Sequence, residues 1–328
     1  MSRDCGTRTV ALELYRLPLA VASDGLVSLR LLAELESVRA ARMDRRVFVV
    51  IVSGPGHRRA QTQMLEVGSA APDPRQLPVA LVIGRHSQCD LRAGLDACLR
   101  HALLMAHPPR GGEPSFVEGI DLATGIGLGV GAPEGASRVV APRALRFGVG
   151  SDTVLAFLAE PGEPLFPEGP EAAVEQLDEG SDPGGAFVRM PAAHRALVRG
   201  GPMLPPTRGF VVESNIVLKT DAGYELLVGS AQLDRGALLG RYERCFGHQD
   251  FEGHTEVSRV HAMVLRRGGR NFVVDCASLN GTALQRADGA IVELGPGHRV
   301  ASIATDDELR IGGFRIHLGS RSERPGAG

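Results

Sequence analysis

Three short polar clusters near the C-terminal end of the chain carry side chains that could bind an anion. They occupy residues 240–241 (Gly-Arg), 258–261 (Ser-Arg-Val-His) and 280–282 (Asn-Gly-Thr). A guanidinium, a hydroxyl and a side-chain amide are donors that suit a phosphate or another hydrogen-bonding anion. These residue types therefore predict a site for an anionic partner such as a phosphorylated peptide.

The same stretch does not carry the signals of an enzyme. Ser258 and His261 could suggest a hydrolase, but the GxSxG elbow is missing. The glycine-rich run at 125–131 has no helical pattern after it, so it does not predict a dinucleotide loop. Lys219 is the only lysine and follows Leu218, which excludes a Walker A pair and the protein kinase motifs. The histidines lack metal-ligand spacing. We expect a non-enzymatic protein with no metal and no cofactor.

Short apolar runs place the three clusters at turns and at the ends of strands. The runs at 262–265 and 272–274 have strand character, and similar runs recur between Gly-rich turns from residue 209 to residue 320. The run at 266–270 (Arg-Arg-Gly-Gly-Arg) predicts a hairpin turn rather than a nucleic-acid patch. A β scaffold of this kind can bring distant loop residues together on one ligand.

The rest of the chain divides by composition into further segments. Residues 1–44 form an extension, 45–160 a first β unit, 161–208 a Pro/Gly-rich linker, 209–320 the second β unit and 321–328 a disordered tail. Short strands between Gly/Pro turns, with no long helices, predict an antiparallel sandwich or barrel in each β unit. The expected fold class is all-β.

Two segments outside the β units leave alternatives open. Residues 26–43 have apolar residues at helical spacing and predict an amphipathic helix that packs on the next domain, or else one that binds a partner. Every charged residue in 160–182 is acidic, which indicates a solvated spacer or a docking tail for a basic partner. Residues 187–199 predict a short helix.

The overall composition of the chain excludes further classes of function. The chain has 328 residues, 43% of them hydrophobic, and a net charge of −2, which gives no argument for nucleic-acid or membrane binding. The five cysteines form no CxxC pair and predict buried free thiols in a reducing compartment. No apolar stretch reaches the length of a membrane span, and the first residues do not resemble a secretory signal. We expect a cytoplasmic protein.

The order of the clusters resembles that of the forkhead-associated (FHA) domain family, whose pattern is GR, then SxxH, then NGT, then a Leu…Gly segment and an apolar-Gly pair. The matching segments are Leu239-Gly240-Arg241, Ser258-Arg259-Val260-His261-Ala262, Ser278-Leu279-Asn280-Gly281-Thr282, Leu294-Gly295 and Leu309-Arg310-Ile311-Gly312. Each motif alone is weak, but the ordered set is specific and covers residues 210–320. The resemblance implies a β-sandwich that binds phosphothreonine peptides through loops at one end.

The resemblance also implies a role for each matching residue. Arg241 and Ser258 would contact the phosphate, and Arg259 would reach the phosphate or the peptide backbone. Asn280 would hydrogen-bond the peptide main chain just after the phosphothreonine.

Four further residues would support the binding loops rather than touch the ligand. These are Gly240, His261, Gly281 and Thr282. Leu279 departs from the family pattern, because many members place a hydroxyl residue there that helps to bind phosphate. The loop from 242 to 257 is also unusual: its acids could repel a phosphate, and its histidines could add positive charge at low pH.

The first β unit resembles an eroded copy of the same pattern. Its matching segments are Ile83-Gly84-Arg85-His86, Cys89-Asp90-Leu91, Cys98-Leu99-Arg100-His101-Ala102 and residues 121–128. In this register Cys98 replaces the phosphate-binding serine, Ile126 replaces the asparagine and Leu128 replaces the threonine, whereas Gly84, Arg85 and His101 remain. We interpret residues 45–160 as a degenerate FHA-like domain with a structural or protein-binding role.

Together these observations predict a signalling adaptor that binds a phosphothreonine-containing protein or peptide downstream of a Ser/Thr kinase. The alternative is a phosphate-independent assembly protein that uses both sandwiches for constitutive contacts. Neither interpretation involves nucleic acid or a membrane.

Overall fold

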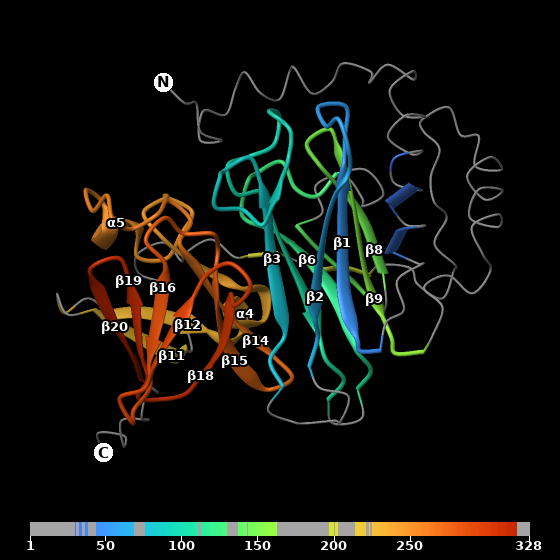
Figure 1. Cartoon of the computed structure of the whole chain (residues 1–328). Helices are drawn as coiled ribbons and strands as arrows, with labels where there is room; N and C mark the ends of the chain where they lie inside the picture. The colour runs from blue at the N-terminus through green and yellow to red at the C-terminus, as the bar shows by residue number, and fades with distance from the viewer. Residues whose placement is uncertain are drawn as a thin grey trace. The chain divides into compact units, whose positions relative to one another are not determined.

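The computed structural model of the chain describes residues 30, 33–34, 37–38, 44–68, 76–110, 113–129, 137–142, 144–162, 197–199, 201–202, 214–220, 223 and 225–319. The chain divides into two compact units, Met1–Arg199 and Gly200–Gly328. Both consist mainly of β-sheets, and the short helices α4 and α5 belong to the second unit (Figure 1). Within the described residues, no helix has the length and apolarity needed to span a bilayer.

The first unit contains a sheet of four strands and a sheet of six. The four-stranded sheet has the order β2-β1-β9-β8 and comprises β1 (Val47–Ser53), β2 (Gln61–Glu66), β8 (Ala144–Val149) and β9 (Asp152–Ala159). The other has the order β10-β7-β6-β5-β3-β4 and comprises β3 (Val79–Gly84), β4 (Leu91–Arg92), β5 (Ala102–His107), β6 (Phe116–Asp121), β7 (Arg138–Ala141) and β10 (Leu197–Arg199). All pairings are antiparallel except the short β3–β4 pair.

The second unit has the same two-sheet construction. Its six-stranded sheet has the order β12-β11-β20-β19-β16-β17 and comprises β11 (Ser214–Thr220), β12 (Glu225–Gly229), β16 (Thr282–Gln285), β17 (Ile291–Leu294), β19 (Glu308–Ile311) and β20 (Phe314–Gly319). Its four-stranded sheet has the order β13-β14-β15-β18 and comprises β13 (Ala237–Leu239), β14 (Ala262–Arg267), β15 (Arg270–Asp275) and β18 (Val300–Ile303). All of these strand pairs are antiparallel.

Alternation of side chains along the strands builds a core between the two sheets of each unit. In the first unit Phe48, Leu104 and Phe147 lie in one buried cluster, and in the second Val264 and Leu309 do the same. The predicted class, all-β with two antiparallel sandwiches, is therefore confirmed.

Local sequence explains the turn between β14 and β15. Gly268 and Gly269 both have positive φ, of 52° and 72°. Two-residue hairpin turns need this left-handed conformation, which glycine adopts without a steric penalty. The predicted hairpin at 266–270 is present.

The helices of the described residues are short. α4 (Ser230–Arg235) lies between β12 and β13, and α5 (His248–Phe251) lies in the long loop before β14. In the predicted N-terminal helix, residues 30, 33–34 and 37–38 are helical. Val38 is buried against the outer face of the β1–β9 sheet, together with Val49. This contact agrees with the prediction that the segment packs on the next domain; the other residues of 26–43 lie outside the described residues.

Two sequence predictions need correction. Leu197–Arg199, within the predicted linker and the predicted short helix, form strand β10, which pairs with β7. This edge pairing outweighs the local helical pattern, since strand formation depends on tertiary context.

Cys89, Cys245 and Cys276 are free and buried as predicted, but Cys98 is disulfide-bonded. The tail at 321–328 lies outside the described residues, and the other predicted domain bounds stay predictions.

Candidate functional site

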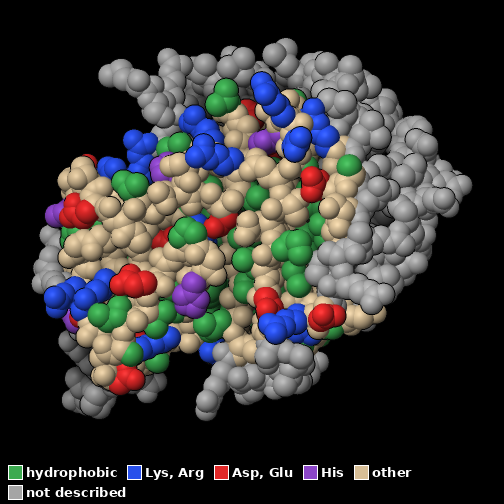
Figure 2. All heavy atoms as spheres, viewed as in Figure 1, with side chains coloured by type: hydrophobic (Ala, Val, Ile, Leu, Met, Phe, Trp, Pro, Cys, Tyr) green, Lys and Arg blue, Asp and Glu red, His purple; other side chains and the backbone are tan. Residues whose placement is uncertain are grey.

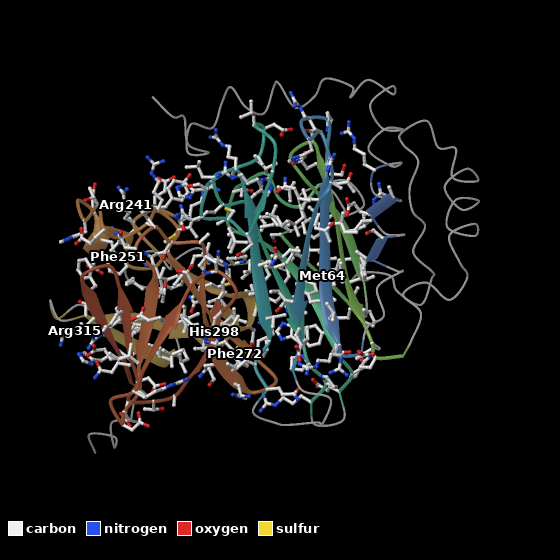
Figure 3. The ribbon with its side chains drawn as sticks, viewed as in Figure 1. Met64, Arg241, Phe251, Phe272, His298 and Arg315 are labelled. Atoms are coloured by element: carbon white, nitrogen blue, oxygen red, sulfur yellow. The ribbon has the colours of Figure 1, made fainter. Side chains whose placement is uncertain are left out.

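Strand pairing in the second unit brings the three polar clusters to one end of the sandwich. Arg241 follows β13, Ser258 precedes β14, and Asn280 lies between β15 and β16. Leu239 pairs with Ala262. Ala262 also pairs with Asp275, so the three loops leave the sheet at the same level. Arg241 and Phe251 of α5 lie at this end of the unit (Figure 3).

His261 connects all three loops and is fully buried. Its Nδ1 accepts a hydrogen bond from the Ser258 backbone N–H at 2.9 Å, so the other nitrogen, Nε2, donates to the Gly281 carbonyl at 2.8 Å. Its own N–H donates to the Leu239 carbonyl at 2.8 Å. With both ring nitrogens engaged, His261 cannot take a proton from the Ser258 hydroxyl. The geometry agrees with a bracing role.

The Ser258 hydroxyl faces the loop that carries Asn280. Its oxygen accepts a hydrogen bond from the Leu279 N–H at 2.9 Å. A serine hydroxyl can in general donate one hydrogen bond while it accepts another, and Ser258 itself is 8% exposed. The Leu279 side chain is 60% exposed and adds no hydrogen-bond donor.

Two consecutive carbonyl groups orient the other predicted ligand-binding side chains. The Arg241 Nε donates to the Val257 carbonyl at 2.7 Å. The Asn280 Nδ2 donates to the Glu256 carbonyl at 2.8 Å. The loop 242–257, considered a possible obstacle from its charges, thus positions Arg241 and Asn280 through its main chain.

A buried carboxylate anchors the loop that carries Asn280. Asp275 accepts hydrogen bonds from the Ser278 hydroxyl at 2.6 Å, the Thr282 hydroxyl at 2.8 Å and an Arg299 guanidinium nitrogen at 2.7 Å. The Asp275 and Arg299 side chains are only 2% and 1% exposed. Buried charges need such pairing because desolvation is costly. Thr282 and Arg299 thus both join this loop to Asp275; the sequence singled out Thr282 but not Arg299.

Gly240 is required by a close approach of two loops. A Cβ at this position would lie 2.3 Å from the Arg259 carbonyl oxygen. No side chain fits at such a distance, so glycine allows the Arg241 and Ser258 loops to meet. Gly281 has a φ of +76° and takes the left-handed conformation that favours glycine. The Arg259 side chain is exposed at the same end of the unit.

The site carries charges of both signs. The Glu256 pKa is lowered because its own backbone N–H and His254 stabilise the carboxylate. Burial raises the pKa of Asp250 in α5. Figure 2 shows acidic and histidine side chains next to one another close to α5. A cationic group, hydroxyl and amide donors, and a neighbouring anion therefore share this loop end.

The first unit repeats the loop frame without the same donors. His101 Nδ1 accepts from the Cys98 N–H at 3.3 Å, and its Nε2 lies 3.2 Å from the Gly127 carbonyl. The Arg85 N–H donates to the Cys98 carbonyl at 3.1 Å, as the Arg241 N–H does to the Ser258 carbonyl at 3.3 Å. By these hydrogen bonds Arg85, Cys98 and His101 of the first unit correspond to Arg241, Ser258 and His261 of the second. Ile126, at the position of Asn280, has no side-chain group that can hydrogen-bond a peptide.

Comparisons with known proteins give similarity at the level of solved structures. No family model matches the chain, and no curated protein matches it. The match to Mycobacterium tuberculosis EmbR in complex with a low affinity phosphopeptide has 18% identity and a TM-score of 0.26, and covers 34% of this chain and 26% of that one. The FHA domain of the Chlamydia trachomatis CT664 protein matches with 18% identity and a TM-score of 0.26, covering 33% of this chain and 100% of that domain. The FHA domain of an Arabidopsis thaliana hypothetical protein has 17% identity and a TM-score of 0.27, with coverage of 38% and 100%. The matches thus concern about a third of the chain, and about a quarter of EmbR.

Proposed function

We propose that the second unit binds phosphothreonine-containing peptides and that the chain is a cytoplasmic, non-enzymatic signalling adaptor acting downstream of a Ser/Thr kinase. The observation that carries the proposal is the placement of Arg241, Ser258 and Asn280 at one loop end by main-chain hydrogen bonds. Held side chains lose little rotamer freedom on binding, which favours affinity. The first unit would stabilise or present the second.

Each side chain has a distinct role in this proposal. The Arg241 guanidinium, oriented through Nε, offers its terminal nitrogens to the phosphate as charge-assisted donors. The Ser258 hydroxyl donates to a second phosphate oxygen. Asn280, held through Nδ2, accepts a peptide N–H at its Oδ1. Arg259 adds positive charge at the rim.

Titration of the full chain with a phosphothreonine peptide and its unphosphorylated copy tests this function. We expect binding of the phosphorylated peptide alone. Arg241→Ala should weaken it by about 10- to 150-fold, since a hydrogen bond to a charged group contributes about 1.5–3 kcal/mol. Arg85→Ala, at the equivalent position of the first unit, is the matched control and should leave binding unchanged. Equal affinity for both peptides would refute the proposal.

A phosphate-independent assembly protein is the second candidate. The exposed Leu279 favours it, because an apolar side chain replaces a phosphate donor in the middle of the site. This function predicts that Ser258→Ala and Asn280→Ala leave partner capture intact. Loss of capture in both variants would favour the phosphopeptide function instead.

A further inference from the structure

Glu256 occupies a position next to Asn280 that the proposed function does not use. Its carbonyl accepts the Asn280 side-chain amide at 2.8 Å. Its side chain lies against the turn between β19 and β20: a Cβ on Gly312 would be 2.9 Å from Glu256 Cγ, and one on Gly313 would be 3.7 Å from Glu256 Oε1. A peptide anchored on Asn280 would therefore lie against the residue that carries this carboxylate.

The surroundings keep this carboxylate in place and charged. His254 Nδ1 lies 3.1 Å from Glu256 Oε1. The His254 ring packs edge-on against Phe314 at 4.5 Å, and Phe314 packs against Phe251 of α5 at 5.0 Å. Glu256 has a lowered pKa, for which the first cause is its own backbone N–H and the second is His254, so it is ionised at neutral pH. Its side chain is still 41% exposed, and a ligand can reach it.

The two sides of the site therefore have opposite charge. Val257 orients the Arg241 guanidinium, and the preceding residue, Glu256, supplies a carboxylate. A phosphate group alone would be repelled by Glu256, whereas a ligand with a phosphate and a nearby cation would satisfy both groups. Since Asn280 is expected to hold the main chain just after the phosphothreonine, the cation belongs on the C-terminal side of that residue.

We propose that Glu256 makes the site selective for phosphothreonine peptides that carry Lys or Arg within about three residues after the phosphothreonine. This inference rests on the proposed phosphopeptide function and names its substrate class. An exposed ion pair of this kind corresponds to about a two- to fivefold preference over a neutral residue. An acidic residue at the same place is disfavoured because it adds a second anion beside Glu256.

The test uses the full chain and three labelled phosphothreonine peptides that differ only in the two residues at positions two and three after the phosphothreonine, which are Lys, Ala or Glu. Fluorescence anisotropy should give the affinity order Lys, Ala, Glu. Glu256→Gln keeps the carbonyl that holds Asn280 and should compress the three affinities to within about twofold of one another. Glu252→Gln removes an exposed acid from the same loop and should keep the wild-type order.

The possible results separate this inference from the proposed function. Phosphate-dependent binding with equal affinity for the three peptides would overturn the selectivity and leave the phosphopeptide function standing. An order that persists in Glu256→Gln would also overturn it, because another residue would then be the selector. If none of the peptides binds, the phosphopeptide function and the selectivity both fail. Circular dichroism of each variant confirms that it is folded.

Discussion

The loop ends of the two units have the same main-chain frame but different side chains on it. In each unit a buried histidine joins three loops, and a glycine lies where the first two loops meet. Ala123 and Ala277 even share the left-handed conformation, with φ of 56° and 59°, although alanine rarely adopts it. The frame and the ligand chemistry are therefore separable, as expected for sites built on a common fold.

The differences concern the side chains that would contact the proposed ligand and those that hold the last loop in place. Ser258 and Asn280 are replaced by Cys98 and Ile126 in the first unit. The residues that donate hydrogen bonds to Asp275 also differ between the two units. Thr282 and Arg299 both hydrogen-bond it, whereas Leu128 and Ser137 stand at the corresponding positions of the first unit. We therefore expect that one kind of substitution lowers the stability of the loop, and that another kind lowers ligand affinity without unfolding the protein.

The largest expected effect comes from removing the buried cation. Arg299→Met leaves the Asp275 carboxylate buried and unpaired, which should lower the free energy of unfolding of the second unit by about 3–5 kcal/mol. Urea denaturation measures this change. Arg266→Met is the control, because its ion pair with Asp234 is exposed and should contribute about 1 kcal/mol or less. Similar losses in the two variants would contradict the role assigned to Arg299.

Converting the second loop end to the chemistry of the first should abolish binding without unfolding the protein. The double variant Ser258→Cys/Asn280→Ile removes two hydrogen-bonding groups, for an expected loss of about 2–4 kcal/mol in phosphopeptide affinity. Isothermal titration measures the affinity, and a thermal melt checks the fold. Because Ile126 stands at the position of Asn280 on the same frame in the first unit, and cysteine is close to serine in size, Tm should change by only a few degrees. A large drop in Tm would show that Ser258 or Asn280 supports the fold itself.

Alkaline pH should affect the second unit through Cys245. Burial raises the pKa of its thiol to about 12, while its S–H donates to the Arg259 carbonyl at 3.3 Å. The folded state therefore holds the proton more tightly than the unfolded state does. This contribution is fully present below about pH 9 and is lost as pH rises toward 12; it amounts to about 2 kcal/mol between pH 9 and 10.5. Urea denaturation at several pH values should show a shallower alkaline loss in Cys245→Ala, and equal slopes in both proteins would contradict this origin.

The sequence predicted which loops would converge, while the binding role of their residues stays a prediction. The spacing of the Arg241, Ser258 and Asn280 motifs between apolar runs predicted loops converging on one sheet end, and strand pairing produces that result. Arg299 was not predictable, because it lies 24 residues from Asp275 and reaches it only through the pairing of β15 with β18. The roles of the carbonyl groups of residues 256 and 257 could not be predicted either, because every residue has such a group and the residue type does not reveal its hydrogen-bond partner. Strand β10 depends on an edge far away in the sequence.

Leu279 offers the smallest and most specific test of the comparison. It stands beside Ser258 and Asn280, its backbone N–H is already bound to the Ser258 hydroxyl, and its exposed side chain contributes no donor. Leu279→Thr would add a hydroxyl to a loop that Asp275 already anchors. A net hydrogen bond contributes about 0.5–1.5 kcal/mol, so phosphopeptide affinity should rise by about two- to tenfold, as titration calorimetry would measure. The same gain with an unphosphorylated peptide would mean that the hydroxyl does not face the phosphate. Leu279→Val, which has nearly the shape of threonine but no hydroxyl, is the control and should leave phosphopeptide affinity unchanged.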